Sequence, residues 1–233
     1  MIQKWIANNF PSLGKYKRYI TAYRDGLMPV KETYSQHQED KFFLTTLTKY
    51  NLNGSLYVDI GANHPTDISN TYLLYRNGMN GIVIEPNAEL ISLFHKFRKK
   101  DTTLAIGCSN VASILKFNIS KTPVISSFSS SRDVNVYKSI YVPVLPLDSA
   151  LNTFQFSYIN LLSIDVEGLT TQVLQGAAST LKRTLLICLE SDSVDEKKEH
   201  EAILGDTFVL VAEFGCNAIY MNKYISSLHK ITV

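Results

Sequence analysis

The chain has 233 residues, of which 45% are hydrophobic and 19% are charged. These proportions are those of a folded globular protein and exclude an intrinsically disordered one, and the length suits one large α/β domain. The net charge of +2 at pH 7 is too small to indicate a nucleic-acid partner by electrostatics alone. Neither a membrane-spanning run nor a signal peptide with a cleavage site is evident. The three cysteines lack C-x-x-C spacing, indicate neither a disulfide framework nor a zinc site, and favour a cytoplasmic location.

The first 24 residues are basic and aromatic, with five Lys and Arg residues and no Asp or Glu. Such a composition is typical of a helix that lies on a membrane surface. It is equally typical of a terminal helix that packs its aromatic side chains on the domain and leaves its bases in water. We favour the second interpretation, but peripheral membrane contact through residues 1–24 stays open. We expect residues 1–33 to be a helical extension in front of one domain that spans residues 34–233.

Strand-like and helix-like segments then alternate along the chain. Five apolar runs predict strands at residues 56–61, 81–86, 103–107, 161–168 and 185–190, and helix-like segments lie at 69–78, 87–100 and 170–183. Near-continuous apolar strands separated by single helices predict a parallel sheet covered on both faces. Near the end of the chain, residues 207–214 and 218–222 flank a Gly-Cys-Asn turn and predict an antiparallel hairpin.

Residues 108–158 depart from this alternation. They carry β-prone runs on either side of a Ser-rich segment at 126–133. We expect an inserted β element and a mobile loop between the third and fourth parallel strands. Loops of this length often act as lids or bind substrates, whereas a disordered connector is the alternative.

Acidic residues stand where three of the predicted parallel strands end: Asp59 on the first, Glu85 on the second, and Asp165 with Glu167 on the fourth. Because ligands bind in the crevice beyond the carboxyl ends of such strands, we expect these four carboxylates around one crevice. Glu85 follows Asp59 by 26 residues, the place where a carboxylate accepts hydrogen bonds from both ribose hydroxyls of a nucleotide. The positions therefore indicate a nucleoside-containing ligand.

The turn after the first strand indicates which nucleoside. It has one glycine, Gly61, and lacks both the G-x-G-x-x-G fingerprint and the lysine of a P-loop. The acid Asp59 at its mouth disfavours phosphate and favours a cation. A ligand with a ribose, a cationic amino-acid end and no phosphate matches S-adenosylmethionine. An NAD-dependent oxidoreductase would share the fold class, but the missing fingerprint argues against it.

Five segments together resemble the FkbM family of S-adenosylmethionine-dependent O-methyltransferases: YSQHQEDKFF (34–43), DIGAN (59–63), IEPN (84–87), LPLDSAL (145–151) and SIDVEGLTTQVLQGA (163–177). The resemblance runs from about Tyr34 to the end of the chain, and GANHP is similar to one subgroup of that family. It implies a class I methyltransferase fold, that is, a Rossmann-like α/β fold. This fold has a mostly parallel seven-stranded sheet, a C-terminal antiparallel hairpin and helices on both faces.

The sequence departs from the family pattern at two places. Pro65 stands where many class I methyltransferases have a second glycine, although this fits the subgroup. Thr170 and Thr171 stand where the family often has an acid shortly after Asp-Val-Glu-Gly, which puts any role carried over to that position in doubt.

The resemblance also implies a set of site residues. Those of the cofactor site are Asp59, Gly61 and Asn63 around the methionyl part, Glu85 on the ribose, Asn87 and Ile106 beside the adenine, and Gln36 and Asp40 closing the pocket. A hydroxyl acceptor also benefits from a base, for which Asp165, Glu167 and His64 are the candidates. Asp165 ranks first because it follows an apolar run, where desolvation would raise its pKa. No third ligand accompanies Asp165 and Glu167, so we predict no metal.

Two features argue against nucleic acid as the substrate. The basic, aromatic segment at 94–100 has the spacing of an amphipathic helix with a solvated basic face. The fourth strand ends in Asp-Val-Glu-Gly rather than in the Pro-Pro-aromatic motif common in amino methylases of bases. The sequence therefore predicts an O-methyltransferase enzyme of polysaccharide biosynthesis that acts on a sugar hydroxyl of a surface glycan or its precursor. A non-sugar small-molecule acceptor, or a non-catalytic module that binds S-adenosylmethionine, is the alternative.

Overall fold

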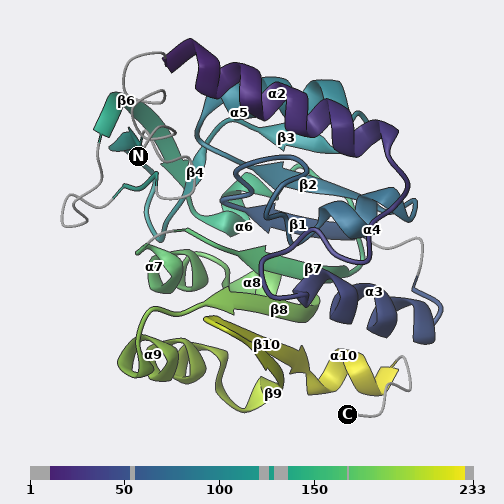
Figure 1. Cartoon of the computed structure of the whole chain (residues 1–233). Helices are drawn as coiled ribbons and strands as arrows, with labels where there is room; N and C mark the ends of the chain where they lie inside the picture. Colours follow the sequence, from purple (N-terminus) through teal and green to yellow (C-terminus); the bar gives the residue numbers. More distant parts are fainter. Residues whose placement is uncertain (1–10, 53–55, 121–125, 129–135, 167, 229–233) are drawn as a thin grey trace.

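In the computed structural model, which describes residues 11–52, 56–120, 126–128, 136–166 and 168–228, a seven-stranded sheet runs through the centre of the molecule (Figure 1). The strands are β1 (Leu56–Ile60), β2 (Asn80–Ile84), β3 (Thr102–Leu104), β7 (Ile159–Ile164), β8 (Thr184–Glu190), β9 (Phe208–Phe214) and β10 (Asn217–Asn222). Their order in the sheet is β3-β2-β1-β7-β8-β10-β9. The first five of these are parallel, and β10 lies antiparallel between β8 and β9. The predicted parallel sheet and C-terminal hairpin are confirmed.

Helices cover both faces of this sheet, as predicted. On one face, α6 (Leu147–Ala150), α7 (Thr170–Gln175), α8 (Ala178–Leu181) and α9 (Val194–Leu204) enclose an apolar core. On the other face, α3 (Glu39–Lys49), α4 (Tyr72–Arg76) and α10 (Lys223–Leu228) enclose a second core, and α5 (Ala88–Phe97) packs against β2 beside them. Strand β8 contributes to both cores with alternating side chains, because successive residues of a strand point to opposite faces. No helix in the described part of the chain has the length and apolar character needed to cross a membrane.

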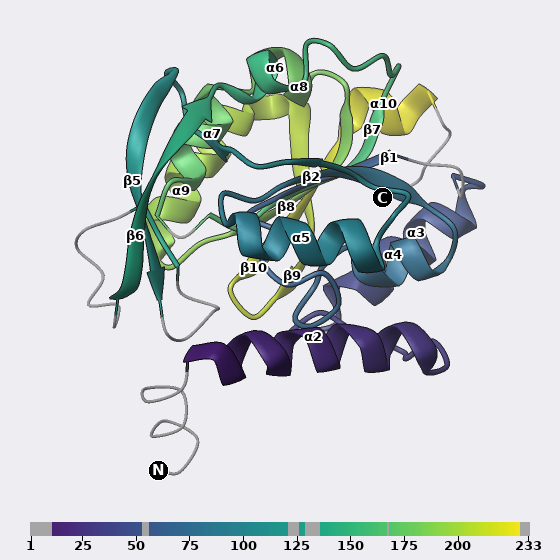
Figure 2. The same cartoon turned by 90° about the horizontal axis from the view of Figure 1, so that it is seen from above.

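A smaller sheet forms where the inserted β element is expected. Its strands are β4 (Gly107–Cys108), β5 (Ser113–Ser120) and β6 (Val136–Leu145), in the order β4-β6-β5. Strands β5 and β6 are antiparallel and stand at one end of the main sheet (Figure 2). Of the Ser-rich segment, only residues 126–128 belong to the described structure, and Ser127 pairs with Asn118 of β5 through two backbone hydrogen bonds. The predicted mobile loop lies mainly outside the described residues.

The single helix expected over residues 170–183 is wrong, because the segment forms two short helices, α7 and α8. The break falls at Gly176, where a Cβ atom would lie 2.3 Å from the backbone oxygen of Ser109. The second helix starts afresh because the Asp148 carboxylate accepts hydrogen bonds from the backbone N–H groups of Ser179 and Thr180, each at 2.8 Å. A close backbone contact and a side-chain cap from a distant segment thus divide a pattern that is helical in sequence.

The basic segment at 94–100 differs from the solvated face expected of it at one position. Arg98 is fully buried, and its Nε lies 2.6 Å from Oδ2 of Asp101. Its Nη2 donates hydrogen bonds to the hydroxyl groups of Tyr57, at 2.7 Å, and Thr71, at 3.0 Å. Arg98 therefore joins the end of α5 to β1 and to the loop that precedes α4. This guanidinium is part of the interior and is unavailable to a nucleic acid.

The N-terminal extension includes a helix, α2 (Pro11–Leu27), that lies alongside α5 (Figures 1 and 2). One face of α2 packs on the domain, with Ala22 fully buried and the ring of Tyr19 edge-on to Phe97 at 5.4 Å between centroids. The other face, which includes Tyr16 and Tyr23, stays exposed. Within α2, the interpretation as a helix that packs its aromatic side chains on the domain therefore holds for one face only, and residues 1–10 lie outside the described residues.

Candidate functional site

A pocket opens at the carboxyl ends of the parallel strands and encloses about 970 Å³ of space, the solvent at its mouth included. Its described lining has no Lys, Arg or His side chain. Its acidic and amide side chains are Gln36, Asp59, Asn63, Asn70, Glu85, Asp165 and Glu190. The inserted sheet closes one side with Phe117 and the neighbouring Phe128. The structure therefore brings Asp59, Glu85 and Asp165 around one cavity, as the strand-end argument predicts.

Glu85 directly follows β2 and is almost fully buried. Its two carboxylate oxygens accept one backbone hydrogen bond each, from the N–H of Asn63 at 2.9 Å and from that of Asn87 at 2.7 Å. Burial raises the pKa of Glu85 to about 7, although both amides oppose the shift. Each oxygen keeps a second lone pair, so the ionised carboxylate can still accept hydrogen bonds from two hydroxyl groups.

Asp59, on β1, is also buried, and its carboxylate accepts a hydrogen bond from the hydroxyl of Thr71. The same hydroxyl accepts a hydrogen bond from Arg98, so the buried guanidinium supports Asp59 through Thr71. Burial raises the pKa of Asp59, and the charge of Arg98 opposes that shift. The residue thus combines a place in the pocket lining with a fixed orientation.

The turn after β1 is held in an unusual backbone conformation. Gly61 and Asn63 have φ angles of 75° and 50°, in the left-handed region that favours glycine. A Cβ atom at Gly61 would lie 1.9 Å from the backbone oxygen of Asp165. The family resemblance places this glycine beside the methionyl part of the cofactor. In the structure, glycine is required at this position because the ends of β1 and β7 pack too closely for a side chain.

Asp165 and Glu190 form a pair of carboxyl groups in the pocket, at the ends of β7 and β8. The pKa of Asp165 is raised well above its usual range, first by burial and then by the charge and hydrogen bond of Glu190. Cys216 donates its S–H to Oε1 of Glu190 at 3.4 Å. The neighbouring Glu190 thus favours the protonated form of Asp165. Sequence reasoning missed Glu190, although it too ends a predicted parallel strand.

Gln36 and Asp40 play different parts on the N-terminal side. Gln36 lines the pocket, as predicted. Asp40 is fully buried outside the lining, where its carboxylate accepts hydrogen bonds from Thr33 at 2.6 Å, from the N–H of Tyr34 at 2.6 Å and from Ser35 at 2.9 Å. Asp40 therefore fixes the loop that carries Gln36 to the pocket.

Of the two residues expected beside the adenine, one lines the pocket and the other lies outside the lining. Ile106 lines the pocket together with Pro86 and Leu90. Asn87 does not, because its Oδ1 caps α5 by accepting from the N–H of Glu89 at 3.0 Å. Its own N–H holds Glu85. Asn87 thus supports the carboxylate and the helix, whereas the apolar wall comes from its neighbours.

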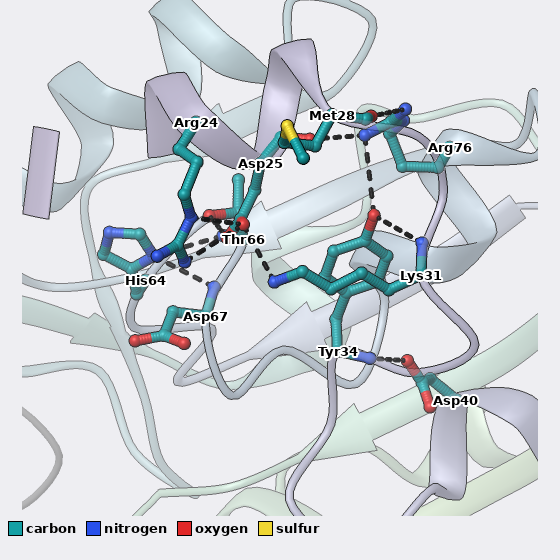
Figure 3. A network of polar contacts seen from close by, with 10 residues as sticks. All are labelled: Arg24, Asp25, Met28, Lys31, Tyr34, Asp40, His64, Thr66, Asp67 and Arg76. Carbon is teal, nitrogen blue, oxygen red and sulfur yellow. Dashed lines mark hydrogen bonds and ion pairs between the residues drawn. The ribbon is translucent and has the colours of Figure 1, made fainter. Parts of the chain in front are cut away.

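Of the other two candidate bases, one lies away from the pocket lining and the other is not among the described residues. His64 is buried outside the lining, where its Nε2 donates to the backbone oxygen of Arg18 at 3.0 Å. Its Nδ1 accepts from the backbone N–H groups of Thr66 and Asp67 (Figure 3). Burial lowers the pKa of His64. Glu167 lies outside the described residues. Within the described part of the chain, no three His, Cys, Asp or Glu side chains are grouped so as to hold a metal ion.

The two threonines that depart from the family pattern lie at the first turn of α7, and neither lines the pocket. Thr170 is buried against the core, and the hydroxyl of Thr171 donates to Glu199 at 3.4 Å. The departure therefore leaves the described pocket lining unaltered.

Comparison with known proteins identifies the family. A family model described as the methyltransferase FkbM domain matches residues 59–213, which is more than half of the chain. The chain belongs to this family of S-adenosylmethionine-dependent methyltransferases, as its sequence motifs predict. The order and direction of its seven strands are those of the predicted class I fold. A search of curated proteins gave no match.

Solved structures with a similar fold include two methyltransferases. Methyltransferase FkbM from Methylobacillus flagellatus KT is 11% identical, with a TM-score of 0.48; the match covers 89% of this chain and 59% of that one, less than two thirds of its length. An O-methyltransferase from Bacillus cereus, in complex with SAH, is 10% identical with a TM-score of 0.47, and the match covers 95% of this chain and 97% of that one.

Proposed function

We propose that this member of the FkbM methyltransferase family is an O-methyltransferase that acts on a sugar hydroxyl of a glycan or of a glycan precursor. The observation that carries the proposal is the pair Asp165 and Glu190, which places two carboxyl groups in the pocket that also holds Asp59 and Glu85. The pocket thus combines a site for a cationic nucleoside with a group able to accept a proton.

The residues present fit S-adenosylmethionine. Glu85 has free lone pairs for the two ribose hydroxyls, and the apolar wall of Pro86, Leu90 and Ile106 suits an adenine ring. The absence of Lys and Arg from the described lining disfavours a phosphate-containing nucleotide, and the carboxylates favour a positive charge. When bound, S-adenosylmethionine supplies a methyl group attached to a positively charged sulfur.

The carboxyl pair supplies the base. The Asp165–Glu190 pair would take the proton of the acceptor hydroxyl as its oxygen receives the methyl group that S-adenosylmethionine would supply, with the electrons of the carbon–sulfur bond left on sulfur. A raised pKa makes a carboxylate a stronger base near neutral pH, which is where general-base catalysis gains most. The remaining requirement is alignment of oxygen, carbon and sulfur, which the walls of the pocket impose.

A polyhydroxylated acceptor suits the polar side chains of this cavity. Besides the carboxyl groups, Gln36 and Asn70 offer amide groups, and Ser126 and Ser127 come from the inserted element. Amides and hydroxyls both donate and accept hydrogen bonds, as sugar hydroxyls do. The non-catalytic alternative has less support, since Thr170 and Thr171 lie away from the pocket lining.

The test is transfer of labelled methyl from S-adenosylmethionine to a panel of glycans, sugar nucleotides and non-sugar alcohols, with mass spectrometry to locate the new methyl group. Asp165→Asn and Glu190→Gln should keep affinity for S-adenosylhomocysteine within a few-fold and lose turnover by about 10²- to 10⁴-fold. Asp206→Asn, an exposed acid outside the pocket, is the matched control and should act as wild type.

Each contrary outcome has a distinct meaning. Folded protein that gives no heat with S-adenosylhomocysteine would overturn the cofactor site. Binding without transfer to any acceptor would favour the non-catalytic module. Methyl transfer to nitrogen, or to non-sugar alcohols alone, would overturn the O-methylation of sugars. Full activity in both carboxyl variants would remove the pair as the base.

A further inference from the structure

The outward face of α2 carries a row of large apolar side chains in water. Tyr16, Ile20, Tyr23 and Leu27 follow one another at steps of four, three and four residues, so they share one face of the helix. Their exposed fractions are 67%, 60%, 53% and 69%. We call these four side chains the outer stripe. An exposed apolar row of this regularity marks an interaction surface more often than scattered single residues do.

The inner face of α2 holds the stripe in this orientation. Asp25 is buried, and its carboxylate accepts a hydrogen bond from the hydroxyl of Thr66 at 3.1 Å (Figure 3). It also forms an ion pair with Lys31 at 2.8 Å. Arg76 donates to the backbone oxygens of Asp25 and Met28. Together with the contact of Arg18 with the His64 ring, these bonds tie α2 to the loop after β1 and to α4. Rotation of the stripe toward the core would break this network.

Basic side chains accompany the stripe. Lys17 and Arg24 are exposed on α2, and residues 1–24 contain no acid. The first acid, Asp25, is buried and paired with Lys31 and Arg24. The surface around the stripe is therefore both apolar and positively charged, which is the pattern of a helix that rests in the headgroup region of a bilayer.

We propose that the outer stripe docks on the surface of an anionic lipid bilayer. The tyrosines and aliphatic side chains would enter the interface, where rings with a polar tip are favoured, while Lys17 contacts the headgroups. A second copy of the chain is the less suitable occupant, because pairing two such faces would bring like charges together. The proposal is independent of the proposed function.

The test is co-sedimentation of the full chain with vesicles of phosphatidylcholine, or of phosphatidylcholine with about one third phosphatidylserine. The wild type should sediment with the anionic vesicles, less so at high salt, and remain in solution with the neutral ones. The triple variant Tyr16→Ser, Ile20→Ser, Leu27→Ser should lose sedimentation. Lys17→Gln should weaken it about fivefold at low salt.

A control variant shows whether sedimentation depends on the outer stripe itself or on exposed apolar side chains in general. Tyr141→Ser, Val194→Ser, Tyr224→Ser removes three side chains that are 76%, 70% and 67% exposed on other elements, and it should sediment as wild type does. Because the stripe is exposed, its variant should keep the wild-type circular dichroism spectrum and its affinity for S-adenosylhomocysteine. Failure of the wild type to sediment at low salt, or unchanged sedimentation of the stripe variant, would overturn the proposal. If the wild type forms a dimer and binds no vesicles, and the stripe variant is monomeric, the face would instead be assigned to a second copy of the chain.

Discussion

Cofactor affinity is expected to depend on pH through Glu85. Burial raises the pKa of this carboxyl to about 7, because the two backbone N–H groups that it accepts from only partly offset its desolvation. Only the ionised form can accept hydrogen bonds from both ribose hydroxyls at its remaining lone pairs. A proton on Glu85 therefore competes with the nucleoside, and affinity should rise as the pH rises through the pKa.

The size of the effect follows from the fraction of ionised Glu85. With a pKa of about 7, that fraction is about one tenth at pH 6 and about nine tenths at pH 8. Since an apparent dissociation constant is the intrinsic one divided by the competent fraction, it should be about tenfold larger at pH 6 than at pH 8. The pKa of Glu85 in the complex should fall correspondingly, because the ligand binds the ionised form.

The assay is isothermal titration with S-adenosylhomocysteine at pH 6, 7 and 8, in buffers chosen so that proton uptake can be subtracted. Glu85→Gln has a similar size and accepts a hydrogen bond but does not titrate, so it should bind more weakly at pH 8 and show little pH dependence. Asp165→Asn should keep the wild-type slope. A flat profile in the wild type, or the same slope in the Glu85 variant, would refute the reasoning.

Three further predictions concern stability and positioning. Arg98→Ala should lower the free energy of unfolding by about 3–5 kcal/mol, because the substitution leaves the buried carboxylate of Asp101 without its ion-pair partner. Urea titration measures this change. Lys99→Ala, at an exposed neighbouring position, is the control and should change the free energy of unfolding by less than about 0.5 kcal/mol. Gly61→Ala should abolish binding of S-adenosylhomocysteine or unfold the protein, whereas Gly26→Ala, which meets no atom within 4 Å, should leave binding intact in the same titration. His64→Ala should speed proteolysis of α2 and leave the turnover number within a few-fold; a loss above about a hundredfold with α2 still protected would make His64 a catalytic base.

The part of the site that the sequence predicts is the part governed by strand ends. Asp59, Glu85 and Asp165 each follow an apolar run, and parallel strands bring such positions to one edge of a sheet. Glu190 obeys the same rule at the end of β8. None of the motifs that resemble the family includes Glu190, so its place at a strand end is the one signal in the sequence that points to it.

The parts that the sequence does not predict depend on contacts between distant segments. Arg98 stands in a row of basic residues at a helix end, and only the fold brings Asp101, Tyr57 and Thr71 around its guanidinium. Periodicity assigns such a residue to water, because it registers spacing along one helix and nothing of what the next layer contains. Gly176 is a similar case: the sequence around it has a helical pattern, and nothing in that pattern indicates that the backbone of Ser109 lies close to it.

The arrangement of donors explains how this pocket holds four acids without a basic side chain in its described lining. Asp59 is stabilised by the Thr71 hydroxyl and Glu85 by two backbone amides, while the hydrogen bond with Glu190 helps to raise the pKa of Asp165. Each acid is thus satisfied by a neutral donor or by another carboxyl, and none is neutralised by a lysine or arginine within the lining. A Lys or Arg in the cavity would neutralise the negative charge of the carboxylates and repel a sulfonium. Neutral donors keep the carboxylates in place and leave their charge for a cationic ligand, so the same hydrogen bonds that stabilise the empty site also favour the binding of S-adenosylmethionine.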